Sequence, residues 1–140
     1  MTLVVDASVA VRWTIATPLS DAAEDLLRAR RALIAPDLIV VEVTNAFCSH
    51  LRNRTDRVQR ALDGLEFLPR WFAELVPSAT LRHRAMALAM ELEHPAYDCF
   101  YLALAASRGS KMITTDEHFL RKIQGSEHGR LALHLSDWRP

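Results

Sequence analysis

The sequence predicts an α/β fold of three layers, in which helices cover both faces of a central, mainly parallel sheet of about five strands. Five short apolar segments recur along the chain, and segments with helical spacing of apolar residues separate most of them. Such alternation is typical of strand–helix–strand units, whose strands run parallel. Half of the 140 residues are apolar and no stretch rich in Pro, Gly or Ser divides the chain, so residues 1–140 are expected to form a single domain.

The first two strands are expected at Leu3–Val5 and at Ala32–Ala35. Between them, the spacing of apolar residues predicts a helix over about Asp21–Arg31. Pro36 is expected to open the next helix, because a proline is tolerated in the first turn, where its missing N–H is not needed. This helix, residues 37–51, is apolar nearly all round, which predicts that it is buried.

The rest of the chain continues the alternation. Thr55 or Asp56 can cap a further helix, whose apolar residues recur at positions 58, 61, 62 and 65. Gly109 is expected to end a later helix. The remaining elements are three strands and two helices, in chain order Ala73–Pro77 (strand), Leu81–Leu92 (helix), Asp98–Arg108 (helix), Lys111–Thr115 (strand) and Leu131–Leu135 (strand).

The composition predicts a soluble, cytoplasmic protein. The apolar N-terminal segment is interrupted by Asp6 and Ser8, and no uncharged run of about 18 residues occurs. Cys48 and Cys99 form no C-x-x-C pair and are expected to be buried, reduced thiols. The formal net charge is zero, so bulk electrostatics does not demand nucleic acid as a partner.

Arginine is used unevenly. The chain has 15 Arg and 2 Lys, and one cluster comprises Arg52, Arg54, Arg57 and Arg60. The planar fork of Arg suits phosphate, to which it donates two parallel hydrogen bonds. The cluster is therefore a candidate phosphate-binding surface, and a solvated helix face is the alternative, since runs of charge usually are solvated.

Two acidic residues directly follow predicted strands. Asp6 ends the first strand and Asp116 ends the fourth. Open parallel sheets bind ligands at this carboxyl edge. Either residue could instead cap the helix that follows it, and position alone does not decide between the two roles.

Two further acids lie in apolar helical segments. Glu42 has no basic residue three or four positions away, so it has no local ion-pair partner. A buried, unpaired carboxylate is costly, and protonation, a distant Arg or a metal ion relieves that cost. Asp98 opens a helix of core-like residues, where a simple N-cap is the alternative.

Four carboxylates that meet at one edge of a sheet would repel one another, and a divalent cation that prefers oxygen removes this repulsion. Mg²⁺ or Mn²⁺ is the expected choice for an all-carboxylate site with room for water. The six histidines show no paired metal spacing, which disfavours zinc, and the four glycines form no phosphate-binding loop.

These motifs resemble those of the PIN-domain ribonucleases, and specifically of the VapC toxins of bacterial toxin–antitoxin pairs. The matching segments are VVDASV with Asp6, PDLIVVEVTN with Glu42 and Asn45, YDCFYLALA with Asp98, and ITTDEHF with Asp116. Each motif alone is weak, whereas four in this order and spacing are specific and span almost the whole chain. One departure is that Cys99 and Phe100 follow the acid where small or polar residues are common in the family, so the rim of the pocket is expected to differ.

The resemblance implies a PIN-like, Rossmann-like fold and an Mg²⁺- or Mn²⁺-dependent endoribonuclease that leaves 3′-hydroxyl and 5′-phosphate ends. It assigns the metal site to four acids, with three residues beside them: Asp6, Glu42, Asp98 and Asp116, then Ser8, Asn45 and Thr114. The arginine cluster would then line an RNA path. The resemblance further implies a homodimer, no membrane association, and a small VapB-like antitoxin that blocks the active site.

Two alternatives remain open. A catalytically silent PIN-like module would only bind RNA or a protein, and the complete set of four acids argues against it. A Rossmann-like phosphatase also has an Asp after its first strand. The haloacid-dehalogenase type needs a second Asp two residues later, where this chain has Ser8.

Overall fold

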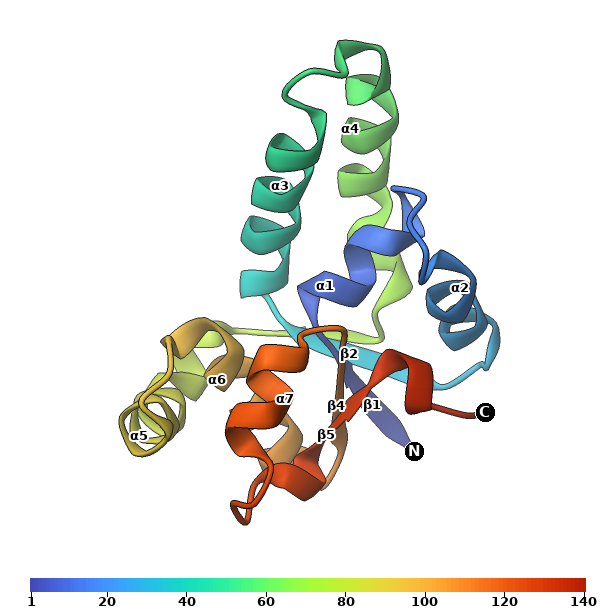
Figure 1. Cartoon of the computed structure of the whole chain (residues 1–140). Helices are drawn as coiled ribbons and strands as arrows, with labels where there is room; N and C mark the ends of the chain where they lie inside the picture. The colour runs from blue at the N-terminus through green and yellow to red at the C-terminus, as the bar shows by residue number, and fades with distance from the viewer.

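The computed structural model describes all residues, 1–140, and contains one five-stranded sheet in which every strand is parallel to its neighbours (Figure 1). The order across the sheet is β3-β2-β1-β4-β5. The N-terminal strand therefore lies at the centre. The strands are β1 (Thr2–Val5), β2 (Ala32–Pro36), β3 (Glu74–Val76), β4 (Lys111–Thr114) and β5 (Ala132–His134).

β1 takes the central place because it is apolar on both faces. Leu3, Val4 and Val5 are all buried, and none is more than 4% exposed. Val4 pairs with Ile34 of β2 on one side and with Met112 of β4 on the other. Strands that are buried on both faces are typical of parallel sheets covered by helices. The predicted α/β fold with a parallel sheet of five strands is confirmed.

Seven α-helices connect and cover the strands: α1 (Ala7–Ala10), α2 (Ser20–Arg28), α3 (Leu38–Leu51), α4 (Val58–Phe67), α5 (Arg82–Leu92), α6 (Ala96–Arg108) and α7 (Glu117–Ile123). α6 packs against β1, β2 and β4, and α5 packs against α6. α3 and α4 form a pair that projects away from the sheet (Figure 1). A membrane crossing would need a longer and more apolar helix than any present here.

The segment after β2 differs from the prediction in two respects. Pro36 does not open the helix; it is the last residue of β2 and pairs with Val76 of β3. α3 begins at Leu38 and is not buried all round, since Val41 is 66% exposed. The prediction of full burial was wrong because α3 projects with α4, so only one face of α3 finds a packing partner. That face consists of Ile39, Val43, Phe47 and Leu51.

Two smaller predictions also fail. Thr55 and Asp56 do not cap α4, because they lie in a 3-10 turn, Thr55–Arg57, and α4 begins at Val58 with no side-chain cap. Cys99 is buried as expected, whereas Cys48 is exposed on α3. Cys48 follows a residue of the buried face of α3, so its own side chain falls beside that face rather than on it.

Candidate metal centre

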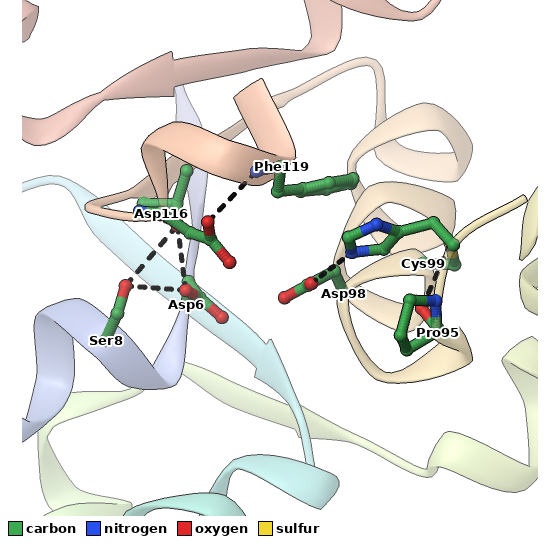
Figure 2. Close-up of polar contacts among 9 residues, drawn as sticks. Asp6, Ser8, Pro95, Asp98, Cys99, Asp116 and Phe119 are labelled. Atoms are coloured by element: carbon green, nitrogen blue, oxygen red, sulfur yellow. Dashed lines mark hydrogen bonds and ion pairs between the residues drawn. The ribbon is translucent and has the colours of Figure 1, made fainter. Parts of the chain in front are cut away.

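Asp6 and Asp116 lie side by side because their strands are neighbours in the sheet. Asp6 directly follows β1, and its backbone N–H donates to the Ile113 carbonyl of β4 at 3.0 Å. Asp116 follows β4 after one intervening residue. Asp98 reaches the same place from α6, and Figure 2 shows its carboxylate directed toward the other two acids. These three aspartates form one acidic cluster. Glu42 on α3 is its fourth member, since the charges of Asp6 and Asp98 affect its pKa.

Asp6 is held by two hydroxyl groups. It is 4% exposed, and its Oδ2 accepts hydrogen bonds from Ser8 Oγ at 2.6 Å and from Thr114 Oγ1 at 2.8 Å. Its side chain makes no helix-capping bond to α1. Burial raises the pKa of Asp6 to about 6, and the charge of Asp98 adds to the increase, while the two hydroxyl bonds oppose it.

Asp116 has the capping role that the sequence left open. Its Oδ1 accepts the backbone N–H of Phe119 at 3.0 Å, in the first turn of α7. Its own N–H donates to Thr114 Oγ1 at 3.1 Å. Thr114 therefore bridges Asp6 and Asp116, and this short network fixes the relative position of the two acids (Figure 2).

Asp98 is not the N-cap of its helix. α6 begins at Ala96 with Pro95 in the cap position, so Asp98 lies inside the first turn and its carboxylate is directed into the site. The Nε2–H of His94 donates to Asp98 Oδ2 at 2.7 Å, and the His94 side chain is only 6% exposed. Burial raises the pKa of Asp98, the charge of Asp116 adds to the increase, and the bond from His94 opposes it.

Glu42 enters the cluster from α3 with a buried oxygen, Oε1, that has no hydrogen-bond partner. Burial raises its pKa to about 7, and the charges of Asp6 and Asp98 add to the increase. The Tyr101 hydroxyl lies close enough to oppose this increase, yet it forms no hydrogen bond of normal geometry and is itself unpartnered. Asn45, the predicted neighbour of Glu42, is exposed, and its role remains a prediction.

The three aspartates share one arrangement. In each, one carboxylate oxygen accepts hydrogen bonds from the protein and the other accepts none. The bonded oxygens fix each carboxylate, and the remaining oxygens are available to a ligand. No Arg or Lys forms an ion pair with any of the four acids.

The acids are not packed tightly enough to share an ion by direct contact alone. A group whose ligand atoms all lie within 4.8 Å of one another occurs elsewhere, at Glu91, Glu127 and His128. In that group, buried His128 donates to Glu91 at 3.1 Å. This hydrogen bond explains why the group is close together. The four acids at the sheet edge do not form such a group.

The arginine cluster lies on the projecting pair of helices, and all four of its members are exposed. Arg52 directly follows the last residue of α3, and Arg54 lies in the connection to α4. Arg60 on α4 donates from Nε to the carbonyl of Thr14 at 3.2 Å, and with Arg57 it lines a cavity of about 290 Å³ beside Thr14. Arg52 lines a different cavity, between α3 and α4, and the proposed contact of the four arginines with RNA remains a prediction.

The sequence reasoning missed three residues that lie at the site. His94 precedes Asp98 by four positions across Pro95, a spacing that could have been noticed. Tyr101 follows Asp98 by three positions, which on a helix places both on one face. Arg12 could not have been found from spacing: it donates to the Ser8 carbonyl at 3.1 Å and to Thr115 Oγ1 at 3.4 Å, and so links the ends of β1 and β4.

Comparisons with known proteins show the family to which the chain belongs. Residues 3–124 match the PIN domain. The chain is 32% identical over 125 residues to the protein named Ribonuclease VapC3 from Pyrobaculum aerophilum, and the match covers 88% of this chain and 95% of that protein.

A solved structure is similar over nearly the whole chain. The crystal structure of PAE2754 from Pyrobaculum aerophilum has a TM-score of 0.71 and 24% sequence identity, and the match covers 97% of this chain and 93% of that one. At this identity the likeness supports the fold alone. Taken with the domain match and the curated relative, which span most of the chain, it leads to the conclusion that this protein belongs to the PIN-domain family and is a relative of the VapC-type ribonucleases.

Proposed function

We propose that the protein is a metal-dependent endoribonuclease that acts as the toxin of a toxin–antitoxin pair. The observation that carries the proposal is the burial of Asp6 and Glu42 beside Asp98, with no Arg or Lys paired to any of them. Such a cluster costs stability, because burial and mutual repulsion both disfavour the charged carboxylates. Domains of modest stability keep such costs mainly where a function requires them.

The donor set fits Mg²⁺ or Mn²⁺. All four side chains offer oxygen, which these hard cations prefer, and the imidazole of His94 donates a hydrogen bond to Asp98 Oδ2. Mg²⁺ also retains several waters when it binds proteins, so the acids need not all contact the ion directly. Asp6 and Asp98 would be the main ligands, and Glu42 and Asp116 would orient the metal or its water.

A bound divalent cation would lower the pKa of a coordinated water and stabilise negative charge on the phosphate during in-line attack. The chain itself supplies orientation. Ser8 and Thr114 fix the Asp6 carboxylate through one oxygen, and the helix N-terminus at Phe119 fixes that of Asp116. Rigid carboxylates reduce the reorganisation needed when substrate binds, which is how a preorganised site accelerates a reaction.

RNA is the proposed substrate, since the relative described above is named a ribonuclease. Family membership also supports a homodimer and a small VapB-like antitoxin. An acidic pocket without a cationic partner is an anchor for Arg, so the antitoxin would block the site with a basic side chain that reaches the carboxylates.

The competing functions are less well supported. A phosphatase of the haloacid-dehalogenase type needs a second acid at position 8, where Ser8 instead donates to Asp6 and accepts the N–H of Thr115 at 3.1 Å. A catalytically silent module would have no need for three aspartates that each leave one oxygen unbonded.

Cleavage of labelled RNA by the purified protein tests the proposal. We expect cleavage with Mn²⁺, 5′-phosphate ends on the products, and loss of activity with EDTA or in Asp98→Asn. RNA binding without cleavage would favour the silent module, and hydrolysis of a small phosphate monoester would favour the phosphatase.

The toxin assignment has its own test. Expression should arrest growth, and co-expression of the small protein encoded next to this gene should restore it. A complex whose acidic pocket stays open would contradict the proposed mode of inhibition, and a monomer at all concentrations in sedimentation would exclude the homodimer.

A further inference from the structure

Tyr101 is buried completely, yet its hydroxyl has no hydrogen-bond partner. A buried hydroxyl without a partner lowers the stability of a fold, and a phenylalanine of nearly the same shape would avoid that cost. Tyr101 lies on α6 three residues after Asp98, so the helix presents both side chains on the same face, toward the acidic cluster.

Only one other buried side-chain oxygen in the protein has no partner, and it is Oε1 of Glu42. The two unpartnered groups come from α6 and α3, and each lies close enough to the other to affect its pKa. Hydrogen bonds at active sites are often long or poorly aligned before ligand binds and shorten in the complex. The Tyr101 hydroxyl is a donor and Glu42 Oε1 is an acceptor. Their proximity is therefore better explained by a hydrogen bond that forms when the active site binds its ligand than by chance.

The protonation state of the hydroxyl determines its role. A phenol has an ordinary pKa of about 10, so the Tyr101 hydroxyl is protonated at neutral pH. A protonated phenol among carboxylates serves as a hydrogen-bond donor. Glu42 is the one of these acids that lacks a donor from elsewhere in the protein.

We propose that Tyr101 is a positioning residue of the active site, whose hydroxyl donates to the Glu42 carboxylate and directs its other oxygen toward the metal or the attacking water. The inference rests on the proposed function, because it assigns Tyr101 a part in the same site. It predicts that the hydroxyl contributes to metal binding and turnover and does not contribute to the stability of the fold.

Tyr101→Phe tests the inference, with Tyr97→Phe as the matched control. Tyr97 is the only other tyrosine, its side chain is 62% exposed, and its hydroxyl forms no hydrogen bond to any of the four acids. In the metal-free protein, Tyr101→Phe should melt at the same temperature as the wild type or a few degrees higher, since it removes an unpartnered hydroxyl. Its affinity for Mn²⁺, measured by calorimetry, should fall about tenfold, as is typical when a hydrogen-bond partner of a metal ligand is lost.

RNA cleavage separates positioning from substrate binding. In Tyr101→Phe, kcat should fall while KM for RNA stays unchanged, whereas Tyr97→Phe should match the wild type in both. A double-mutant cycle on Mn²⁺ affinity then identifies the partner. In a Glu42→Gln background, Tyr101→Phe should have little further effect, because the bond between the two side chains is already weakened.

Three results would overturn the inference. A Tyr101→Phe protein that melts lower but keeps the wild-type kcat and Mn²⁺ affinity would show a structural role. A Tyr101→Phe protein identical to the wild type in all measurements would show that the hydroxyl has no role. Effects on Mn²⁺ affinity that add in the double-mutant cycle would show that Tyr101 does not act through Glu42. A wild type that neither binds Mn²⁺ nor cleaves RNA would instead remove the proposed function, and this inference with it.

Discussion

The rings of His94 and Phe119 stack, with centroids 4.9 Å apart and planes inclined by 23°. His94 donates to the Asp98 carboxylate, and the backbone N–H of Phe119 donates to that of Asp116. The stacked pair therefore joins the acid on α6 to the acid at the start of α7. Asp98 and Asp116, two acids of the proposed metal site, are thus coupled through the stacking of His94 on Phe119.

This coupling predicts losses of different size for two His94 variants. His94→Phe keeps a ring for stacking but lacks the N–H, so Mn²⁺ affinity measured by calorimetry should fall about tenfold. His94→Gln loses the ring but can place an amide N–H near the same point, so it should retain more of the affinity. If the phenylalanine variant binds Mn²⁺ as well as the wild type, the hydrogen bond to Asp98 has no part in metal binding.

Asp6→Asn should stabilise the metal-free protein by about 1 kcal/mol at neutral pH. The substitution removes a buried charge, and Asn can still accept the hydroxyl bonds from Ser8 and Thr114, although these bonds weaken without the charge. Chemical denaturation measures the change.

Metal should reverse the ranking of these two proteins. Mn²⁺ binds only the folded state and should raise the melting temperature of the wild type, with a much smaller rise in Asp6→Asn. A variant that keeps both the full Mn²⁺ shift and RNA cleavage would exclude Asp6 from the site.

The metal-free protein should become more stable as the pH is lowered from about 8 to about 5. The folded-state pKa values are about 6 for Asp6 and about 7 for Glu42. Both exceed the values of about 4 expected in the unfolded chain, so the folded state binds the extra protons in this range. The stabilisation is complete below about pH 4 and is lost as the pH rises through the folded-state values.

For Asp6 alone, this linkage is on the order of 2 to 3 kcal/mol. Asp6→Asn should therefore show a flatter dependence of unfolding free energy on pH than the wild type. Urea denaturation at several pH values measures this dependence. If the unfolding free energies of the two proteins change equally with pH, Asp6 is ionised in the folded state without cost.

Arg52 and Arg54 should contribute to RNA affinity through phosphate contacts. α3 rises by about 1.5 Å per residue, so Arg52 lies roughly 15 Å along the helix from Glu42, within reach of a bound single strand. In an Asp98→Asn background that does not cut RNA, Arg52→Gln/Arg54→Gln should reduce the salt slope of log K by about 1.4, the value for two contacts to a single strand. Arg130→Gln/Arg139→Gln, with the same change in charge, should keep the slope. If the salt slope of log K is the same in the Asp98→Asn protein and in both of its arginine variants, Arg52 and Arg54 do not contact RNA and are simply solvated side chains.

The sheet and its acids could be predicted because their signals are local. A short apolar segment that ends in a carboxylate indicates a strand that delivers Asp6 to an edge, and the same pattern recurs at Asp116. What could not be predicted was the environment of α3. Its composition indicates burial, but exposure depends on whether a neighbouring element covers each face, and α3 projects from the domain with α4.

The supporting contacts of the site depend on tertiary structure in the same way. Thr114 was expected beside Asp6 only because of the family resemblance, since 108 residues separate the two in the chain. The stacking of His94 on Phe119 depends on how α6 and α7 pack, which no periodicity encodes. The capping roles show the same limit: sequence allowed a cap at Asp6, Asp98 and Asp116, and only Asp116 forms one.

The central position of β1 has a consequence for how the protein is made. The first strand to be synthesised pairs with β4, whose residues 111–114 are among the last. Pairing between segments so distant in the chain forms late, because the cost of closing the long loop must be met before the contact contributes. A growing chain that ends before β4 has Asp6 but lacks both Thr114 and Asp116. The acidic cluster therefore cannot form until synthesis has passed residue 116 of 140.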